Sequence, residues 1–165
     1  MRTLLILRHG KAANEEGGLD RDRALTKRGK REAEHVGQRL RDSDLVPNRI
    51  ITSSARRARD TARRVAAESG FRGAIDELDE LYLADPEAYI TATKRLADED
   101  AERILVVGHN PGLEALALLL TGEPTSLPTA GLVVCALPIA DFSELSLEVS
   151  GKLTRFERPK GLEGG

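Results

Sequence analysis

An arginine and a histidine follow a short apolar run near the start of the chain. Residues 4–7 are apolar at consecutive positions, and Arg8, His9 and Gly10 come next. The run predicts a strand that is buried on both faces. In open α/β sheets, ligands bind at the carboxyl ends of the strands. An arginine beside a histidine at that place therefore predicts an anion site next to a nucleophile or proton carrier.

Two later segments repeat this order of strand, turn and basic side chain. Residues 50–51 lead through Ser53 and Ser54 to Arg57, and residues 106–107 lead through a glycine to His109. If the strands are parallel, their turns emerge at one edge of the sheet. We then expect four side chains to meet there: Arg8, His9, Arg57 and His109.

Two arginines and two histidines around one point suit a phosphoryl dianion. Guanidinium groups bind phosphate oxygens in pairs, and a helix that begins near Ala55 directs its N-terminal amides to the same place. A histidine can be the nucleophile and form a phosphohistidine that water cleaves. His9 is the better candidate, because Arg8 flanks it and Gly10 lets a ligand approach. Each segment alone also fits ordinary structure, so the inference depends on all three occurring together.

The elements that must position these residues alternate along the chain. Helical spacing is expected after Thr26 (residues 33–40), at residues 58–66 ending near Gly70, after Pro86, and at residues 113–120, which are apolar almost all round and predict a deeply packed helix. Strands are expected at residues 4–7, 50–51, 104–107 and 132–137, and alternation at 143–155 predicts one more. Strands that alternate with helices indicate an α/β fold with a mainly parallel sheet.

Composition limits the number of domains and the kinds of partner that the chain can have. The chain has 165 residues, of which 40% are apolar, and a net charge of −2. We expect a single domain over residues 1–158 with a flexible tail at 159–165. The charge gives no reason to expect nucleic acid or a membrane as a partner.

Basic residues gather in residues 1–64, where they are either a solvated face or the frame of an anionic substrate. The single Cys135 predicts a buried, inert thiol, and the absence of a leader predicts a reducing, cytoplasmic location.

The complete set of motifs resembles the histidine phosphatase superfamily. The motifs are Leu7–Gly10, Leu25–Gly29, Ser53–Ala62 and Val107–Pro111. The sequences of residues 22–26 and 107–112 are similar to those of the SixA-type phosphohistidine phosphatases. The resemblance implies a phosphoglycerate mutase-like three-layer sandwich, with helices on both faces of the sheet.

The resemblance also assigns roles to residues. His9 corresponds to the phosphorylated nucleophile, and Arg8, Arg57 and His109 correspond to the rest of the phosphate pocket. Arg23 matches a position that adds a phosphate contact in the SixA-like branch. Glu80, in Leu78-Asp79-Glu80, matches the general acid of many members, although it stands in an acidic run. Asn14 stands one residue before the position of the family's asparagine.

The sequence favours a metal-independent phosphohistidine phosphatase that needs no cofactor and acts on a phosphorylated protein histidine. A phosphomonoesterase acting on a small phosphate ester is the alternative within the superfamily, and a non-catalytic phosphate-binding module is the alternative outside enzymes. A metallohydrolase would need paired ligand spacing, which the three histidines at 9, 35 and 109 lack. No pattern in the chain predicts a particular oligomeric state.

Overall fold

The computed structural model of the chain describes residues 1–14 and 17–159. Its strands are β1 (Arg2–Arg8), β2 (Arg49–Ser53), β3 (Ile75–Leu78), β4 (Arg103–Gly108), β5 (Leu132–Leu137) and β6 (Lys152–Glu157). They form one six-stranded sheet in the order β3-β2-β4-β1-β5-β6. The pairs β1–β4, β2–β4 and β2–β3 are parallel, whereas β5 and β6 are joined antiparallel. The mainly parallel α/β sheet is therefore confirmed.

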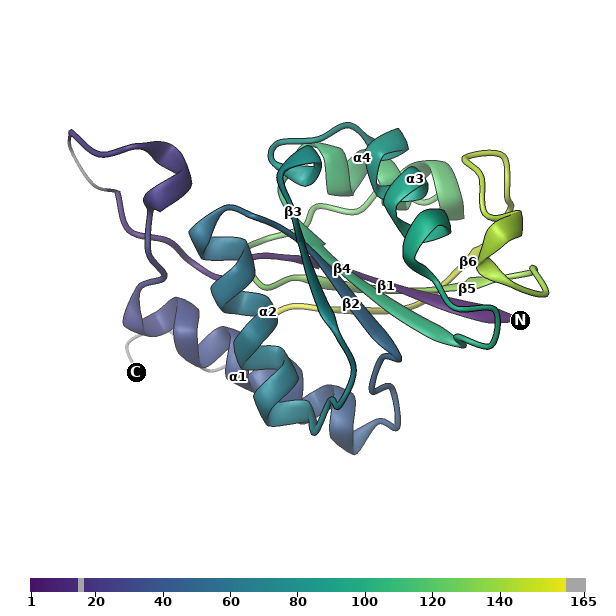
Figure 1. The fold of residues 1–165 in the computed structure, drawn as a ribbon, viewed down its shortest axis with the longest axis horizontal. Coiled ribbons are helices and arrows are strands. Elements are labelled where there is room, and N and C mark those ends of the chain that lie inside the picture. Colours follow the sequence, from purple (N-terminus) through teal and green to yellow (C-terminus); the bar gives the residue numbers. More distant parts are fainter. Residues whose placement is uncertain (15–16, 160–165) are drawn as a thin grey trace.

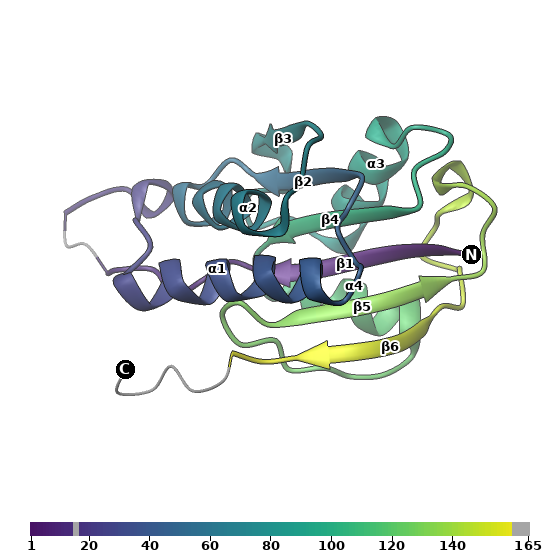
Figure 2. The same cartoon turned by 90° about the horizontal axis from the view of Figure 1, so that it is seen from below.

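Helices cover both faces of this sheet (Figure 1). They are α1 (Lys27–Asp42), α2 (Arg56–Ser69), α3 (Pro86–Leu96) and α4 (Gly112–Thr121), with single 3-10 turns η1 (Asp20–Asp22), η2 (Asp79–Leu81) and η3 (Phe142–Glu144). Figure 2 shows α1 and α2 side by side in front of the sheet. The pair α3 and α4 lies on the opposite face, which completes the expected three-layer sandwich.

The side chains of β1 alternate between the two layers of the core. Leu4 and Ile6 pack in the cluster that α3 and α4 cover, whereas Leu5 and Leu7 pack in the cluster under α1 and α2. All four are buried, with at most 1% of each exposed. Since β1 is covered on both faces, its apolar residues are consecutive rather than alternating.

The helix ends follow the expected signals. Thr26 caps α1 by accepting a hydrogen bond from the amide of Gly29 at 3.0 Å. The helix α2 ends at Gly70, whose φ of 80° is in the left-handed region that glycine adopts without strain. Thr26 thus fixes the start of α1, and Gly70 fixes the end of α2.

Three expectations need correction. The strand β3 was not expected, because its acidic residues mark an edge strand that only β2 pairs. The further strand expected at residues 143–155 is present as the antiparallel edge strand β6, but it begins only at Lys152, because residues 145–151 form a loop from which Leu145 packs into the core. The helix α4 buries one side only: Leu118 and Leu119 are 45% and 48% exposed, since they face away from the sheet.

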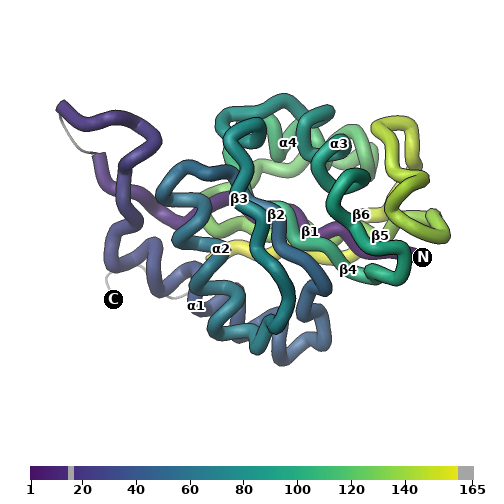
Figure 3. The backbone as a smooth tube through the Cα atoms, in the orientation of Figure 1, coloured from purple at the N-terminus to yellow at the C-terminus, as the bar shows by residue number. Residues whose placement is uncertain are grey.

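The carboxyl ends of the parallel strands lie opposite the N-terminus. In Figure 3 the segment that follows β1 extends beyond this edge before the chain returns to α1. Within the described residues, no helix has the length and apolar character to cross a membrane. The tail expected at 159–165 lies, from residue 160 onward, outside the described residues.

Candidate active site

A polar pocket opens where β1, β2 and β4 end. Eleven described residues line it: Arg8, His9, Lys11, Ala12, Asn14, Arg23, Arg57, Leu83, His109, Asn110 and Thr129. The register of β1 and β4 explains why the two histidines lie together. Arg8 on β1 pairs with Gly108 on β4, so the next residues, His9 and His109, are side by side. Their ring centroids are 5.3 Å apart.

His9 is buried and held in one orientation. Its Nδ1 lies 2.7 Å from the carbonyl oxygen of Gly10, to which it donates, and its Nε2 lies 3.3 Å from Nε of Arg57. Burial, and then the positive charges nearby, lower the pKa of His9 to about 3. The ring is therefore neutral at pH 7, with its proton on Nδ1 and a lone pair on Nε2.

Arg57 occupies the first turn of α2 and connects His9 to the turn η1 in the loop after β1. Its Nη1 and Nη2 donate to the backbone oxygen and to Oδ2 of Asp20, at 2.8 Å and 3.0 Å. Tyr82 also donates to Oδ2 of Asp20, and Arg23 pairs with Oδ1 at 3.0 Å. Hydrogen bonds from Tyr82, Arg23 and Arg57 hold the pKa of Asp20 well below its usual range.

His109 is fixed by the end of β2. Its Nε2 lies 2.8 Å from the hydroxyl of Ser53, which also accepts the amide of Ala55 at 3.2 Å. A hydrogen bond therefore joins Nε2 to Ser53, which leaves Nδ1 as the other polar atom of the ring. That Nδ1 is buried and has no hydrogen-bond partner in the described part of the chain. Burial, then Arg57, lower the pKa of His109 to about 4, so the ring offers one neutral N–H donor.

The two remaining arginines, Arg8 and Arg23, also line the pocket. Arg8 donates from Nη1 to the carbonyl of Leu127 at 3.1 Å, while its buried Nε is without a partner among residues 1–14 and 17–159. Arg23 donates from Nε to the carbonyl of Ala13 at 2.8 Å. Both guanidinium groups line the pocket with donors directed by backbone contacts, which suits an anion with several oxygens.

Glu80 is the one predicted site residue that the structure does not bring to this pocket. Its side chain is half exposed, and its carboxylate pairs with Arg95 on α3 at 3.1 Å. The neighbouring Leu81 is fully buried in the core, so the turn η2 directs Glu80 outward. Glu80 is therefore not among the described residues that line the pocket around His9.

Sequence reasoning missed the residues that support the pocket. Asp20 and Tyr82 bind Arg57 and each other, Ser53 orients His109, and Thr61 accepts the amide of Gly10 at 3.0 Å. Ser53 and Thr61 stand inside the motif around Arg57, one at the strand end and the other a helical turn after the arginine. That spacing was the available signal for these two residues.

Neither the cysteine nor a metal cluster offers a second centre. Cys135 is buried, and burial raises the pKa of its thiol to about 11. Within residues 1–14 and 17–159, no three His, Cys, Asp or Glu side chains are grouped so as to hold a metal ion.

Comparison with known proteins places this geometry in a family. The model of the histidine phosphatase superfamily (branch 1) matches residues 4–88. The uncharacterized protein ML1117 of Mycobacterium leprae is 34% identical over 169 residues, which cover 93% of this chain and 100% of that protein.

Solved structures extend the likeness to the whole chain. A protein of Agrobacterium tumefaciens, provisionally assigned as the phosphohistidine phosphatase SixA, has a TM-score of 0.79 at 30% identity, covering 96% of this chain and 98% of that one. The protein histidine phosphatase SixA complexed with tungstate also has a TM-score of 0.79, at 25% identity, covering 93% and 95%. The mycobacterial glucosyl-3-phosphoglycerate phosphatase Rv2419c, at 18% identity and a TM-score of 0.68, shares the fold and covers 94% and 98%.

Proposed function

The chain belongs to the histidine phosphatase superfamily, and from that membership we propose that it is a phosphohistidine phosphatase that hydrolyses a phosphorylated protein histidine through a covalent phosphohistidine on His9. The likeness to SixA proteins supports the substrate class. We assign phosphate binding to Arg8, Arg57 and His109, with Arg23 as a further contact.

The state of His9 is the observation that carries this proposal. A neutral ring with its proton held on Nδ1 by Gly10 presents the Nε2 lone pair beside Arg57. Such a nitrogen attacks phosphorus in line, while the guanidinium groups neutralise the equatorial oxygens. The Nε2–P bond forms as the bond from phosphorus to the substrate ring breaks, and that ring leaves as neutral imidazole because its other nitrogen already carries a proton. Water then attacks phosphorus, the Nε2–P bond breaks, and inorganic phosphate leaves.

The described part of the pocket lining has no acidic side chain, which supports an imidazole as the leaving group. None of the described residues that line the pocket is an Asp or a Glu. Asp20, the nearest carboxylate to Arg57, is ionised at neutral pH because three donors lower its pKa, so it carries no proton to give. An alkoxide needs a proton to leave, whereas imidazole is a far better leaving group. Exchange between two imidazoles is also nearly balanced in energy, so positioning decides its rate.

A substrate panel tests the proposal. Wild type and His9→Ala are compared on a phosphohistidine protein, an aryl phosphate and an alkyl phosphate, and each is incubated with a phosphoryl donor. We expect phosphohistidine to be cleaved fastest, acid-labile phosphate to appear on His9 of the wild type, and both to be lost in His9→Ala.

Other outcomes would assign a different function. Faster cleavage of the esters would make the protein a small-molecule phosphomonoesterase of the same superfamily. Neither label nor turnover in the wild type would make it a phosphate-binding module. Activity abolished by EDTA would contradict metal independence. The cytoplasmic location stays a prediction of the sequence.

A further inference from the structure

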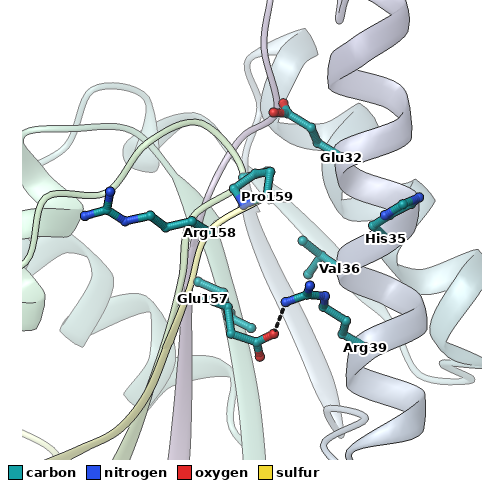
Figure 4. Close-up of a pocket in the computed structure, with 9 residues that line it drawn as sticks. Glu32, His35, Val36, Arg39, Glu157, Arg158 and Pro159 are labelled. Carbon is teal, nitrogen blue, oxygen red and sulfur yellow. Dashed lines mark hydrogen bonds and ion pairs between the residues drawn. The ribbon is translucent and has the colours of Figure 1, made fainter. Parts of the chain in front are cut away.

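A buried carboxylate lies behind the nucleophile, on the side away from the phosphate pocket. Glu32 belongs to α1, and only 1% of its side chain is exposed. Figure 4 shows it at one end of a small cavity between α1 and β6, with its carboxylate directed at the N-terminal segment of the chain. Glu32 pairs with Arg28 through Oε2 at 3.4 Å, and its Oε1 accepts the amide of Lys11 at 3.1 Å.

That amide belongs to the peptide group that holds His9. The carbonyl of Gly10 and the N–H of Lys11 are two ends of one peptide unit. The carbonyl accepts Nδ1–H of His9 at 2.7 Å, while the N–H donates to Glu32. A chain of two hydrogen bonds therefore connects the carboxylate to the imidazole. Hydrogen bonds in such a chain polarise one another, most strongly where water is excluded.

The surrounding contacts leave this peptide a single position. The amide of Gly10 donates to Thr61 at 3.0 Å, and the carbonyl of Lys11 accepts the amide of Thr26 at 2.9 Å. Gly29 packs so closely that a Cβ there would lie 2.1 Å from the oxygen of Lys11. The peptide is thus fixed between α1 and α2, and Glu32 is the one charged group that binds it within the described residues.

We propose that Glu32 is a positioning residue for His9: through the Gly10–Lys11 peptide, its carboxylate keeps the proton on Nδ1 and the Nε2 lone pair directed at the phosphoryl group. The inference rests on the proposed role of His9 as nucleophile. When Nε2 forms its bond to phosphorus, the ring keeps the Nδ1 proton and gains positive charge. The polarised carbonyl of Gly10 stabilises that charge, which is how an aspartate supports the histidine of a serine protease.

The variant Glu32→Gln tests this role, because it keeps an oxygen for Lys11 and removes the charge. With ³²P-phosphoramidate as phosphoryl donor, we expect acid-labile label to appear on His9 about tenfold more slowly, as is usual when the outer partner of a histidine is lost. The Kd for inorganic phosphate should stay within about twofold, since the pocket side chains are untouched. Glu34→Gln is the matched control: Glu34 is on the same helix and pairs with Arg64 at 3.5 Å, and its loss should leave the labelling rate unchanged.

Three results would overturn the proposal. If Glu32→Gln is labelled at the wild-type rate, the charge of Glu32 has no effect on His9. If the labelling rate and the affinity for phosphate fall equally, the role of Glu32 is merely structural. The third needs no variant: ¹⁵N chemical shifts of the wild-type ring should place the His9 proton on Nδ1, and a proton on Nε2 would contradict the chain of hydrogen bonds. If wild type is labelled but does not cleave protein phosphohistidine, only the proposed substrate fails.

Discussion

Arg57 binds an anion that belongs to the protein itself. The carboxylate of Asp20 lies 3.0 Å from Nη2 of Arg57 and is also bound by Arg23 and Tyr82. A phosphoryl group that binds Arg57 competes with this carboxylate for the same donors. Asp20 is half exposed, so the turn η1 can carry it away from Arg57 without uncovering the core.

We therefore expect Asp20→Asn to tighten phosphate binding by about threefold to tenfold at low salt, and by less at high salt, because an exposed charge is screened. The inhibition constant of inorganic phosphate measures this effect. Asp22→Asn, on the same turn, is the control for a general loss of negative charge. Weaker binding in Asp20→Asn would mean that Asp20 positions Arg57 rather than competing for it.

The sequence identified four residues that line the pocket but not the residues that hold them in place. Arg8, His9, Arg57 and His109 were found because each follows a strand in a pattern of residue types. Glu32 acts on His9 through a backbone amide, and the position of an amide depends on the packing of α1, which no residue pattern describes. Glu80 matched a motif in spacing, but the burial of its neighbour Leu81 turns it toward Arg95.

At the level of elements, the first turn of α1 packs directly against the loop that follows His9. Gly29 packs against the backbone of Lys11, and a Cβ at Gly10 would lie 2.6 Å from the oxygen of Gly29. The contact is between backbone atoms on both sides, so no flexible side chain can move to relieve a clash there. Helix and loop must therefore move together.

Gly29→Ala should accordingly destabilise the protein by about 1–3 kcal/mol, as overpacking does, and should lower kcat by about a hundredfold, because a shift of an ångström misplaces the nucleophile. Urea unfolding and turnover measure the two effects. Gly37→Ala is the matched control on the same helix, where a Cβ would lie 2.7 Å from the backbone oxygen of Val65, between α1 and α2. It should lose stability and keep kcat; equal losses of kcat in both variants would refute the role of the first turn.

Elements with a strong apolar pattern were predicted correctly. Elements whose conformation depends on pairing or packing with a neighbouring segment were not. β1 and β4 read as consecutive apolar residues because helices cover both their faces. β3 is acidic and owes its strand conformation to pairing with β2. Residues 145–149 keep an alternating pattern although they form a loop, because the loop packs Leu145 into the same core as α3.

For the molecule as a whole, the burial of two histidines in the pocket affects both the proposed reaction and the stability of the fold. His9 and His109 are buried as neutral rings, with pKa values lowered to about 3 and about 4 by burial first and then by nearby positive charge. In the unfolded chain both return to about 6.5. Between these values the unfolded chain binds protons that the folded protein does not, so stability must fall as the pH falls. The site that keeps His9 unprotonated thus weakens the fold in mild acid.

We expect the free energy of unfolding to decrease from about pH 6.5 to about pH 4.5 with a slope of up to about 2.7 kcal/mol per pH unit, which corresponds to two protons. Urea titrations in a buffer without phosphate measure it. His109→Gln should reduce the slope by about half, because one of the two protons is removed. His35→Gln, at an exposed position of α1, is the control for a histidine substitution outside the pocket. A flat profile over this range would mean that folding does not lower the pKa of either histidine, and that burial is not what keeps His9 neutral.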